Sequence, residues 1–352
     1  MATETKRMRV RQSDSATAKS KNETLRLGEF FYETDTGEIK IGDGVTKYNA
    51  LLGVRSEAKI AQALASGVYK GQDLSIKFAS EIAKYGSVAD FLHARCAAGN
   101  FEGIYPFDYW YENTGAATIA GTAIEAKSRK CVIAGIDLYY GTGDNGDLVT
   151  KHHLTIFAGL SDMNVTFNDI NDNNGSTNSE YPWLASKAYA VLNGVNNKGT
   201  NKAGTIGFDA SSGGFLQIFS SKLRSYMVEQ RCHLPKRYSS TATLTDHNGQ
   251  GWVGRGMLFA PSEIEAYGCL IHSTKPTMAA HNPEGFGPFE QFPIFRSAGN
   301  NGRLLFGRST FWLCSVAGGS STLACNVYGG GSADAYYTTS THIRLPLCFH
   351  IA

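Results

Sequence analysis

Residues 141–146, Gly-Thr-Gly-Asp-Asn-Gly, match the nucleotide-binding pattern G-x-G-x-x-G and follow an apolar run. In a dinucleotide-binding fold a helix must come directly after this pattern, because the helix N-terminus holds the pyrophosphate. The residues that follow, Asp-Leu-Val-Thr-Lys-His-His-Leu-Thr-Ile-Phe, are instead typical of another strand. The motif therefore predicts a hairpin loop, and no cofactor is expected.

A second run has the residue types of a calcium-binding loop. It begins at Asp169, continues with Asn and Asp, and has Glu180 at its twelfth place. A calcium loop of this kind needs glycine at the sixth place and a helix before the loop. Here Gly175 comes one place late, and no helix is predicted before Asp169. We expect residues 164–178 to form a solvated loop without a metal ion.

The pair His152–His153 is the remaining candidate for a base or a metal ligand. No third ligand with zinc-site spacing lies nearby. Successive strand residues point to opposite faces, so one imidazole is expected inside the protein and one outside. The sequence has no G-x-S-x-G, no Walker A motif and no paired cysteine–histidine signature of a nucleophile. The chain is therefore predicted not to be an enzyme.

Charge and hydropathy exclude further classes of function. The 352 residues include 33 Lys and Arg against 31 Asp and Glu, a formal charge of +2. This balance gives no electrostatic footprint for a nucleic-acid backbone or an anionic membrane. The longest strictly apolar stretches, such as residues 131–134, fall far short of the roughly 18 residues that a spanning helix needs. We expect a soluble protein made in a cytoplasm, with no nucleic-acid partner and no membrane insertion.

Cysteine usage and glycine content point to the fold class. The 7 cysteines are odd in number and no pair has C-x-x-C spacing, so most are expected to be buried, reduced thiols. The 39 glycines, with abundant Tyr, Thr, Ser and Asn, are typical of a turn-rich β protein. We predict an α+β fold that is mostly β.

The first 53 residues form a distinct zone. Residues 29–33 and 38–41 are two β-type runs around the turn Thr-Asp-Thr-Gly, which predicts a hairpin. Fifty residues with so few large apolar side chains cannot form a stable domain alone. We therefore expect residues 1–53 to pack on copies of themselves.

Residues 54–87 are predicted to be a short helical linker. Residues 54–72 are rich in alanine, and residues 74–85 carry apolar side chains at helical spacing. Ser87 is a suitable N-cap for a further helix that runs towards Cys96. From there to residue 352 we expect short strands and turns, with helices near residues 183–192 and 222–228.

The composition of residues 313–352 is unusual. They contain no Lys, Glu, Gln, Met or Trp, and consist largely of Ser, Thr, Gly, Ala, Tyr, Cys and Asn. Tyrosine among Ser, Gly and Asn is the composition of adaptable recognition surfaces, because tyrosine offers contact area at low entropy cost. An ordinary strand-and-turn segment of a β domain has similar residues, so composition leaves both interpretations open.

The N-terminal zone resembles a known family. Residues 27–51 read Leu-Gly-Glu-Phe-Phe-Tyr-Glu-Thr-Asp-Thr-Gly-Glu-Ile-Lys-Ile-Gly-Asp-Gly-Val-Thr-Lys-Tyr-Asn-Ala-Leu. This run resembles the N-terminal domain of phage major-tropism-determinant proteins, with its E-T-D-T-G and K-I-G-D-G-x-T patterns. The resemblance implies a small intertwined trimeric β domain that attaches to other virion proteins of the tail or head.

Residues 88–352 resemble the C-type-lectin-like domains of phage receptor-binding proteins, including those varied by diversity-generating retroelements. The matching pieces include residues 133–140, residues 259–268 and the terminal signature from Trp312 to Cys348. Cys314 stands where the family has Arg, and Leu345 separates Arg344 from Pro346.

This second resemblance implies a receptor-binding surface between the two ends of the signature. Trp312 would be a buried anchor, and the guanidinium of Arg344 would lock the last strand. The missing residue types also fit a tract diversified at asparagine codons. The residues implied to contact the receptor are Ser320, Ser321, Asn326, Tyr328, Asp334, Tyr336, Tyr337, Thr338 and Thr339.

Together the two resemblances imply a phage tail-fibre or receptor-binding protein. It would be a homotrimer on the virion, assembled in the host cytoplasm, that adheres to a host surface glycan or protein. The alternative is a structural head or tail decoration protein with no receptor-binding role. A third possibility is an enzyme, since formylglycine-generating enzymes have a related fold, but no reactive cysteine pair is present by spacing.

Overall fold

The computed structural model describes residues 10–51, 53–144, 147–173, 182–194, 213–234, 251–273, 290–298, 300–318 and 320–352. The fold is mixed, with 30% strand against 24% helix, so the expectation of a mostly β protein is confirmed at that level. The chain divides into two compact units. One comprises residues 1–69 with 76–78, and the other comprises residues 70–75 with 79–352.

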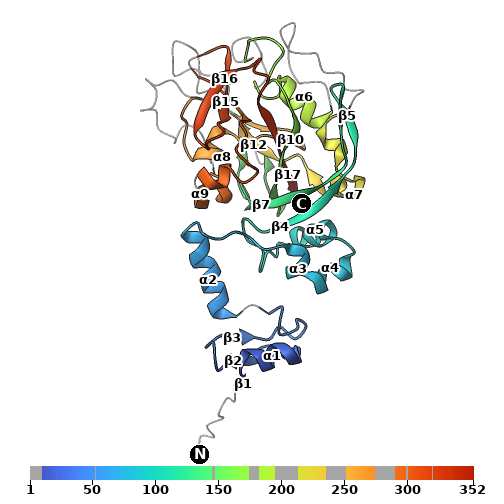
Figure 1. The fold of residues 1–352 in the computed structure, drawn as a ribbon, viewed down its shortest axis with the longest axis vertical. Helices are drawn as coiled ribbons and strands as arrows, with labels where there is room; N and C mark the ends of the chain where they lie inside the picture. Colours follow the sequence, from blue (N-terminus) through green and yellow to red (C-terminus); the bar gives the residue numbers. More distant parts are fainter. Residues whose placement is uncertain are drawn as a thin grey trace, which may run out of the picture. The chain divides into compact units, whose positions relative to one another are not determined.

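The N-terminal unit is built on a three-stranded sheet. Strand β1 runs parallel to β2, and β2 pairs antiparallel with β3 through a turn at Gly37, whose φ of +69° favours glycine. The hairpin predicted at residues 29–41 is thus confirmed (Figure 1). The elements are β1 (Arg11–Ser13), α1 (Ser15–Lys21), β2 (Phe30–Glu33), β3 (Ile39–Ile41) and α2 (Val54–Ala65).

The core of this unit is small. It contains Ala18, Leu25, Phe31 and Tyr48, and the rings of Phe31 and Tyr48 pack edge to face at 4.8 Å. Lys40 is buried beside them, where its Nζ donates to the Tyr48 carbonyl at 2.8 Å. Among the described residues of this unit, so few buried apolar side chains supply little of the free energy that an independent domain needs.

The other face of the same sheet is apolar and exposed. Phe30, Tyr32, Ile39 and Ile41 are each between 37% and 43% exposed, and the register pairs Phe30 with Ile41 and Tyr32 with Ile39. Because strand residues alternate, these four side chains lie opposite the core residue Phe31. We call these four residues the outer apolar face.

The C-terminal unit is organised around an eight-stranded sheet. Seven strands follow the order β16-β15-β14-β17-β10-β7-β4, and β11 pairs with one end of β17. The strand bounds are β4 (Tyr109–Thr114), β7 (Lys127–Ile136), β10 (Leu154–Asn164), β11 (Met227–Val228), β14 (Phe311–Val316), β15 (Leu323–Val327), β16 (Ala333–Tyr337) and β17 (Arg344–Ile351). Three two-stranded ribbons complete it: β5 (Ala117–Ile119) with β6 (Thr122–Ile124), β8 (Gly143–Asp144) with β9 (Asp147–Leu148), and β12 (Arg231–Leu234) with β13 (Gly251–Gly254).

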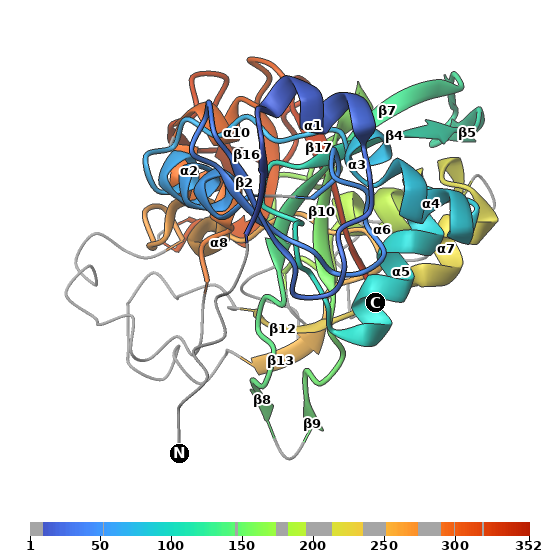
Figure 2. The same cartoon turned by 90° about the horizontal axis from the view of Figure 1, so that it is seen from below.

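Short helices cover this sheet. In Figures 1 and 2, α6 and α7 lie across the sheet from α8. The helices are α3 (Leu74–Lys77), which falls at the boundary of the two units, α4 (Ala79–Tyr85), α5 (Val88–Ala98), α6 (Lys187–Asn193), the 3-10 helix η2 (Phe215–Ile218), α7 (Ser221–Tyr226), α8 (Glu263–Tyr267), α9 (Pro293–Ala298) and α10 (Asn300–Arg303).

Most predicted helices are present, with shifted bounds. The alanine-rich run forms α2, and Ser87 caps α5 by accepting a hydrogen bond from the Asp90 N–H at 3.1 Å. The helix expected over residues 74–85 is divided into α3 and α4 at Phe78. The helix expected near Trp183 begins later, because Ser186 supplies the cap of α6.

Strand β17 lies in the middle of the sheet. It pairs with β10 on one side and β14 on the other, and seven of its eight residues are buried. Helix α5 packs near its far end, where the Cys96 thiol donates to the Ile351 carbonyl and His93 Nδ1 lies 2.7 Å from the Ala352 carbonyl. Burial raises the pKa of the Cys96 thiol to about 12, so it stays protonated at neutral pH.

A buried ion pair lies beside the sheet. Arg255 and Glu265 are each 1% exposed, and Nη1 of Arg255 donates to both carboxylate oxygens at 2.8 and 2.6 Å. The Tyr139 hydroxyl donates to the same carboxylate at 2.8 Å, and the guanidinium lies 3.7 Å from the ring centroid of Phe259. Glu265 also forms the capping box of α8 with Ser262.

Candidate functional site

The nine predicted receptor-binding residues lie on and around the hairpin of β15 and β16, at one edge of the sheet. Three of them are exposed, and four are partly exposed. The exposed residues are Ser321, Tyr328 and Tyr337, and the partly exposed ones are Ser320, Asp334, Tyr336 and Thr339. Tyr336 and Tyr337 are neighbours in one strand, so their rings point to opposite faces of the sheet.

Asn326 and Thr338 are fully buried, so they cannot contact a receptor on this surface. Asn326 lies on β15 opposite Trp312 of β14, and neither atom of its side-chain amide has a hydrogen-bond partner in the described part of the chain. The Thr338 hydroxyl donates to the Ile170 carbonyl at 2.9 Å. The resemblance implied that both lie on an exposed face, whereas four of the five residues of β15 are buried and Thr338, which follows β16, contacts Ile170.

The Asn-rich loop is packed against the same region. Asn173 is completely buried, and its amide nitrogen donates to the carbonyls of Ser320 and Leu323 at 2.7 and 3.0 Å. Asn168 is also buried, and its backbone N–H donates to the Thr338 carbonyl. The expectation of a solvated loop is therefore wrong for the buried Val165, Phe167, Asn168, Asp172 and Asn173, whereas Asn164, Asp169 and Asn171 are exposed. Gly175 and Glu180 of the expected calcium pattern lie outside the described residues.

Two residues that the sequence did not single out, Arg303 and Tyr267, hydrogen-bond to the turn of the hairpin. Nε of Arg303 donates to the Gly331 carbonyl at 2.8 Å, and the Tyr267 hydroxyl reaches the same carbonyl at 3.3 Å. The guanidinium of Arg303 also lies 4.4 Å from the centroid of the Tyr267 ring. No sequence signal identifies Arg303, because its partner is a backbone carbonyl 28 residues away. The hairpin is therefore fixed to the helices beneath it.

Of the two predicted scaffold residues, Trp312 has the expected buried position, whereas the side chain of Arg344 does not have the expected role. Trp312 is fully buried and its indole N–H donates to the Val165 carbonyl at 2.8 Å, as an anchor should. The backbone of Arg344 pairs with Thr310, but its guanidinium has no hydrogen bond or ion pair to any described residue. The side chain of Arg344 therefore does not lock the last strand.

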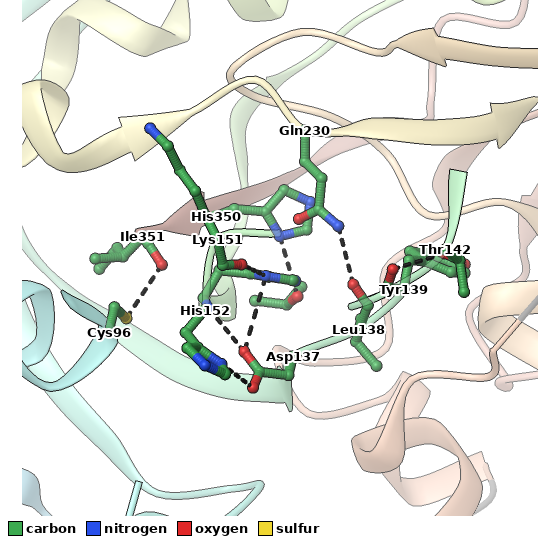
Figure 3. A network of polar contacts seen from close by, with 12 residues as sticks. Cys96, Asp137, Leu138, Tyr139, Thr142, Lys151, His152, Gln230, His350 and Ile351 are labelled. Atoms are coloured by element: carbon green, nitrogen blue, oxygen red, sulfur yellow. Dashed lines mark hydrogen bonds and ion pairs between the residues drawn. The ribbon is translucent and has the colours of Figure 1, made fainter. Parts of the chain in front are cut away.

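The histidine pair divides as expected, with His152 36% exposed and His153 buried. Figure 3 shows His152 turned towards Asp137, whose carboxylate oxygen lies 2.7 Å from Nδ1 of the ring. The ring also stacks on Tyr140 at 4.4 Å, and Gly99 at the end of α5 lies against its edge. Asp137 has a φ of +50° and accepts the His153 backbone N–H as well. These hydrogen bonds and ring contacts hold the turn after β7 against the segment before β10.

A histidine–carboxylate pair is part of many hydrolytic sites, which also require a nucleophile beside the free ring nitrogen. Within the described ranges, the side chain of His152 hydrogen-bonds only to Asp137. The nearby Thr142 hydroxyl donates instead to the Tyr139 carbonyl at 2.6 Å. The arrangement therefore fixes a loop and contains no nucleophile–base contact.

Two further imidazoles are buried behind this network. The rings of His153 and His350 meet edge to face at 5.3 Å, and Nε2 of each has no partner among the described residues. Burial lowers the pKa of His153. Burial, with the positive charge of the nearby Arg255 acting in the same direction, lowers the pKa of His350 well below its usual value. Both rings are neutral at pH 7.

The remaining candidate motifs are structural. Gly143 and Asp144 of the G-x-G-x-x-G pattern form β8, which pairs with β9 as the expected hairpin, and this ribbon extends away from the sheet in Figure 2. Asn145 and Gly146 of the pattern lie outside the described residues. Six of the seven free cysteines are buried and Cys269 is exposed. In the ranges that the structure describes, no three His, Cys, Asp or Glu side chains form a metal-binding group. No helix in those ranges is both long enough and apolar enough to cross a bilayer.

Neither a family model, nor a curated protein, nor a solved structure matches this chain. The function is therefore inferred from its own residues and their geometry.

Proposed function

We propose that the chain is a phage tail-fibre or receptor-binding protein that trimerises through residues 1–53 and adheres to the host surface through residues 88–352. In this proposal the first segment is an intertwined β domain attached to other virion proteins, and residues 54–87 are a helical linker. The last segment is a C-type-lectin-like domain that binds a host glycan or protein. Three copies would multiply weak individual contacts through their effective concentration.

The observation that carries the adhesion proposal is the exposure of tyrosine on a fixed edge hairpin. Tyr328 and Tyr337 are 46% and 57% exposed, and the turn between their strands is held by Arg303 and Tyr267. Tyrosine on a rigid support binds with little loss of side-chain entropy, and interface hot spots are enriched in it. The dense N-terminal resemblance supports the assignment to a virion.

Adhesion is tested by single alanine variants of the two exposed tyrosines and of Tyr336. We expect Tyr337→Ala to weaken adsorption of the purified protein to a susceptible bacterium by roughly tenfold or more, as loss of a hot-spot tyrosine does. The matched control is Tyr111→Ala, because Tyr111 is also 57% exposed but lies on β4 at the opposite edge of the sheet. Adsorption that is equal in Tyr337→Ala, Tyr328→Ala, Tyr336→Ala and the control would reject this surface. A protein that binds particles but no bacterium would favour the decoration role.

Trimerisation is supported by the outer apolar face and by the small core of the N-terminal unit. We expect the wild-type protein to have a mass near three times 38.0 kDa in light scattering. The variant Phe30→Ser/Ile41→Ser removes one cross-strand pair of that face and is expected to shift the mass towards one chain, because apolar area contributes about 25 cal/mol per Å² buried.

The control for this variant is Val68→Ser, which changes an apolar residue that is 61% exposed and lies outside the sheet. It is expected to leave the mass unchanged. A wild-type protein that remains a single chain at micromolar concentration would contradict trimerisation. A double variant that remains a trimer would show that the outer apolar face is not the trimer interface.

A further inference from the structure

A second surface feature lies away from the β15–β16 hairpin. It is a depression of about 240 Å³ lined by parts of β7, β10 and β17 and by Phe306. It occurs where β10 departs from regular pairing with β17, since the register shifts between Phe157 and Leu160 and again before Asn164. Gly159 has a φ of +88° at this irregularity, and a Cβ there would lie 3.4 Å from the Phe306 ring. The positive φ favours glycine here, and Gly159 contributes no side chain to the lining of the depression.

Basic side chains dominate its walls. Lys127, Arg129, Lys130 and Arg344 line the depression, against the single carboxylate of Asp162. Asp162 is already bound, since Lys127 contacts one oxygen and Nη2 of Arg129 lies 2.5 Å from the other. Arg129 is 5% exposed, and its Nη1 donates to the Leu160 carbonyl at 3.0 Å, so its position is fixed. The carboxylate thus neutralises only part of the local positive charge.

Lys130 lies over the ring of Tyr109, 3.8 Å from its centroid, whereas Arg344 has no such contact among the described residues. Its side chain is partly buried at the rim, where it makes no hydrogen bond or ion pair to the described residues. Its guanidinium is therefore available to a ligand, and its planar fork matches a carboxylate or phosphate in a bidentate geometry. The residue that the resemblance made a scaffold is therefore placed to bind a ligand.

We infer that this depression binds a small anionic group, a carboxylate or phosphate on a single sugar-sized ligand, with Arg344 as the principal contact and Lys127 as the second. The volume is below the roughly 300–1,000 Å³ of sites for drug-sized ligands, which restricts the occupant to about one small ring. Phe306 supplies an apolar wall for that ring. The role of the site in recognising acidic host glycans rests on the proposed function, whereas binding of the anion does not.

The test is calorimetric titration of the full chain at low ionic strength with glucuronate, glucose 6-phosphate and glucose. We expect saturable binding of one or both anions and none of glucose, and at least tenfold weaker binding to Arg344→Gln. The relative affinity of the two anions distinguishes a carboxylate site from a phosphate site. The matched control is Arg308→Gln, which removes the same charge from an exposed arginine beyond Phe306. The exposed Lys127→Gln serves as a second variant if Arg344→Gln does not fold, and it should also weaken binding.

The inference would be overturned if neither anion bound the wild type. It would also be overturned if the anion bound Arg344→Gln and Arg308→Gln equally, or if glucose bound as tightly as glucuronate. Adsorption to bacteria separates the two proposals. If Arg344→Gln loses anion binding but adsorbs as the wild type does, the site stands and its link to adhesion fails. If Arg344→Gln and all three tyrosine variants adsorb normally while the anion still binds the wild type, the adhesion surface fails and the anion site remains.

Discussion

Replacing Glu265 by Gln is expected to lower the free energy of unfolding of the C-terminal unit by about 3–5 kcal/mol, because it leaves a buried cation without its counter-charge. Arg255 is 1% exposed, and its Nε and Nη2 have no hydrogen-bond partner in the described part of the chain. The Glu265 carboxylate is therefore the main group that compensates the buried guanidinium. Urea unfolding followed by tryptophan fluorescence measures the change.

Two comparisons isolate the charge effect. The double variant Arg255→Met/Glu265→Gln removes both charges and should recover at least half of the loss, since neutral replacement of a buried pair is often well tolerated. Lys222→Gln breaks the ion pair with Asp90, in which the lysine is 58% exposed, and should cost far less than Glu265→Gln because exposed ion pairs contribute little to stability. A loss below 1 kcal/mol in Glu265→Gln would show that the pair is not needed for stability.

Acidification is expected to destabilise the same unit through His153 and His350. Both have a pKa below the ordinary value of 6.5 because they are buried, so the unfolded chain binds their protons more tightly than the folded one does. Stability should be level above pH 6.5. Below it, stability should fall by up to about 1.4 kcal/mol per pH unit for each histidine until the pH reaches the folded-state pKa.

The histidine origin of this slope can be checked by substitution. His350→Phe keeps an aromatic ring against Phe259, with which His350 stacks at 4.7 Å, and should remove about half of the loss of stability between pH 6.5 and 5. His342→Gln changes an exposed histidine and should leave the slope unchanged. If the melting temperature of His350→Phe falls with pH as steeply as that of the wild type, the buried pair is not the cause.

Local signals in the sequence predicted the local structure well. The cap at Ser87, the hairpin ending at Ile41 and the division of the histidine pair each depend on residues only a few positions apart. The asparagine-rich loop could not be predicted in the same way. Asn173 looks like a loop residue by composition, but its partners are carbonyls 147 and 150 residues further along the chain. Its burial is a property of the tertiary fold.

The structure of the candidate site also depends on tertiary contacts that local sequence signals do not predict. Asn326 follows the apolar residues Leu-Ala-Cys, which is a signal of a buried strand, yet the resemblance placed it on the surface. The basic depression needs the irregular pairing of β10 with β17, which no pattern in Leu154–Asn164 predicts. The nearby cluster of Lys127, Arg129 and Lys130 at the start of an apolar strand was the available clue.

The central position of β17 also sets the order in which the molecule can assemble. Its partner β10 is synthesised far earlier, since the hydrogen-bonded residues Thr155 and His350 are 195 positions apart. Until β17 leaves the ribosome, β10 and β14 present unpaired edges to the cell. Folding of this unit is therefore a late, non-local event, and contacts over such distances make it slow. The nascent chain has to be kept from aggregating during that interval, which makes chaperone supply a determinant of its yield.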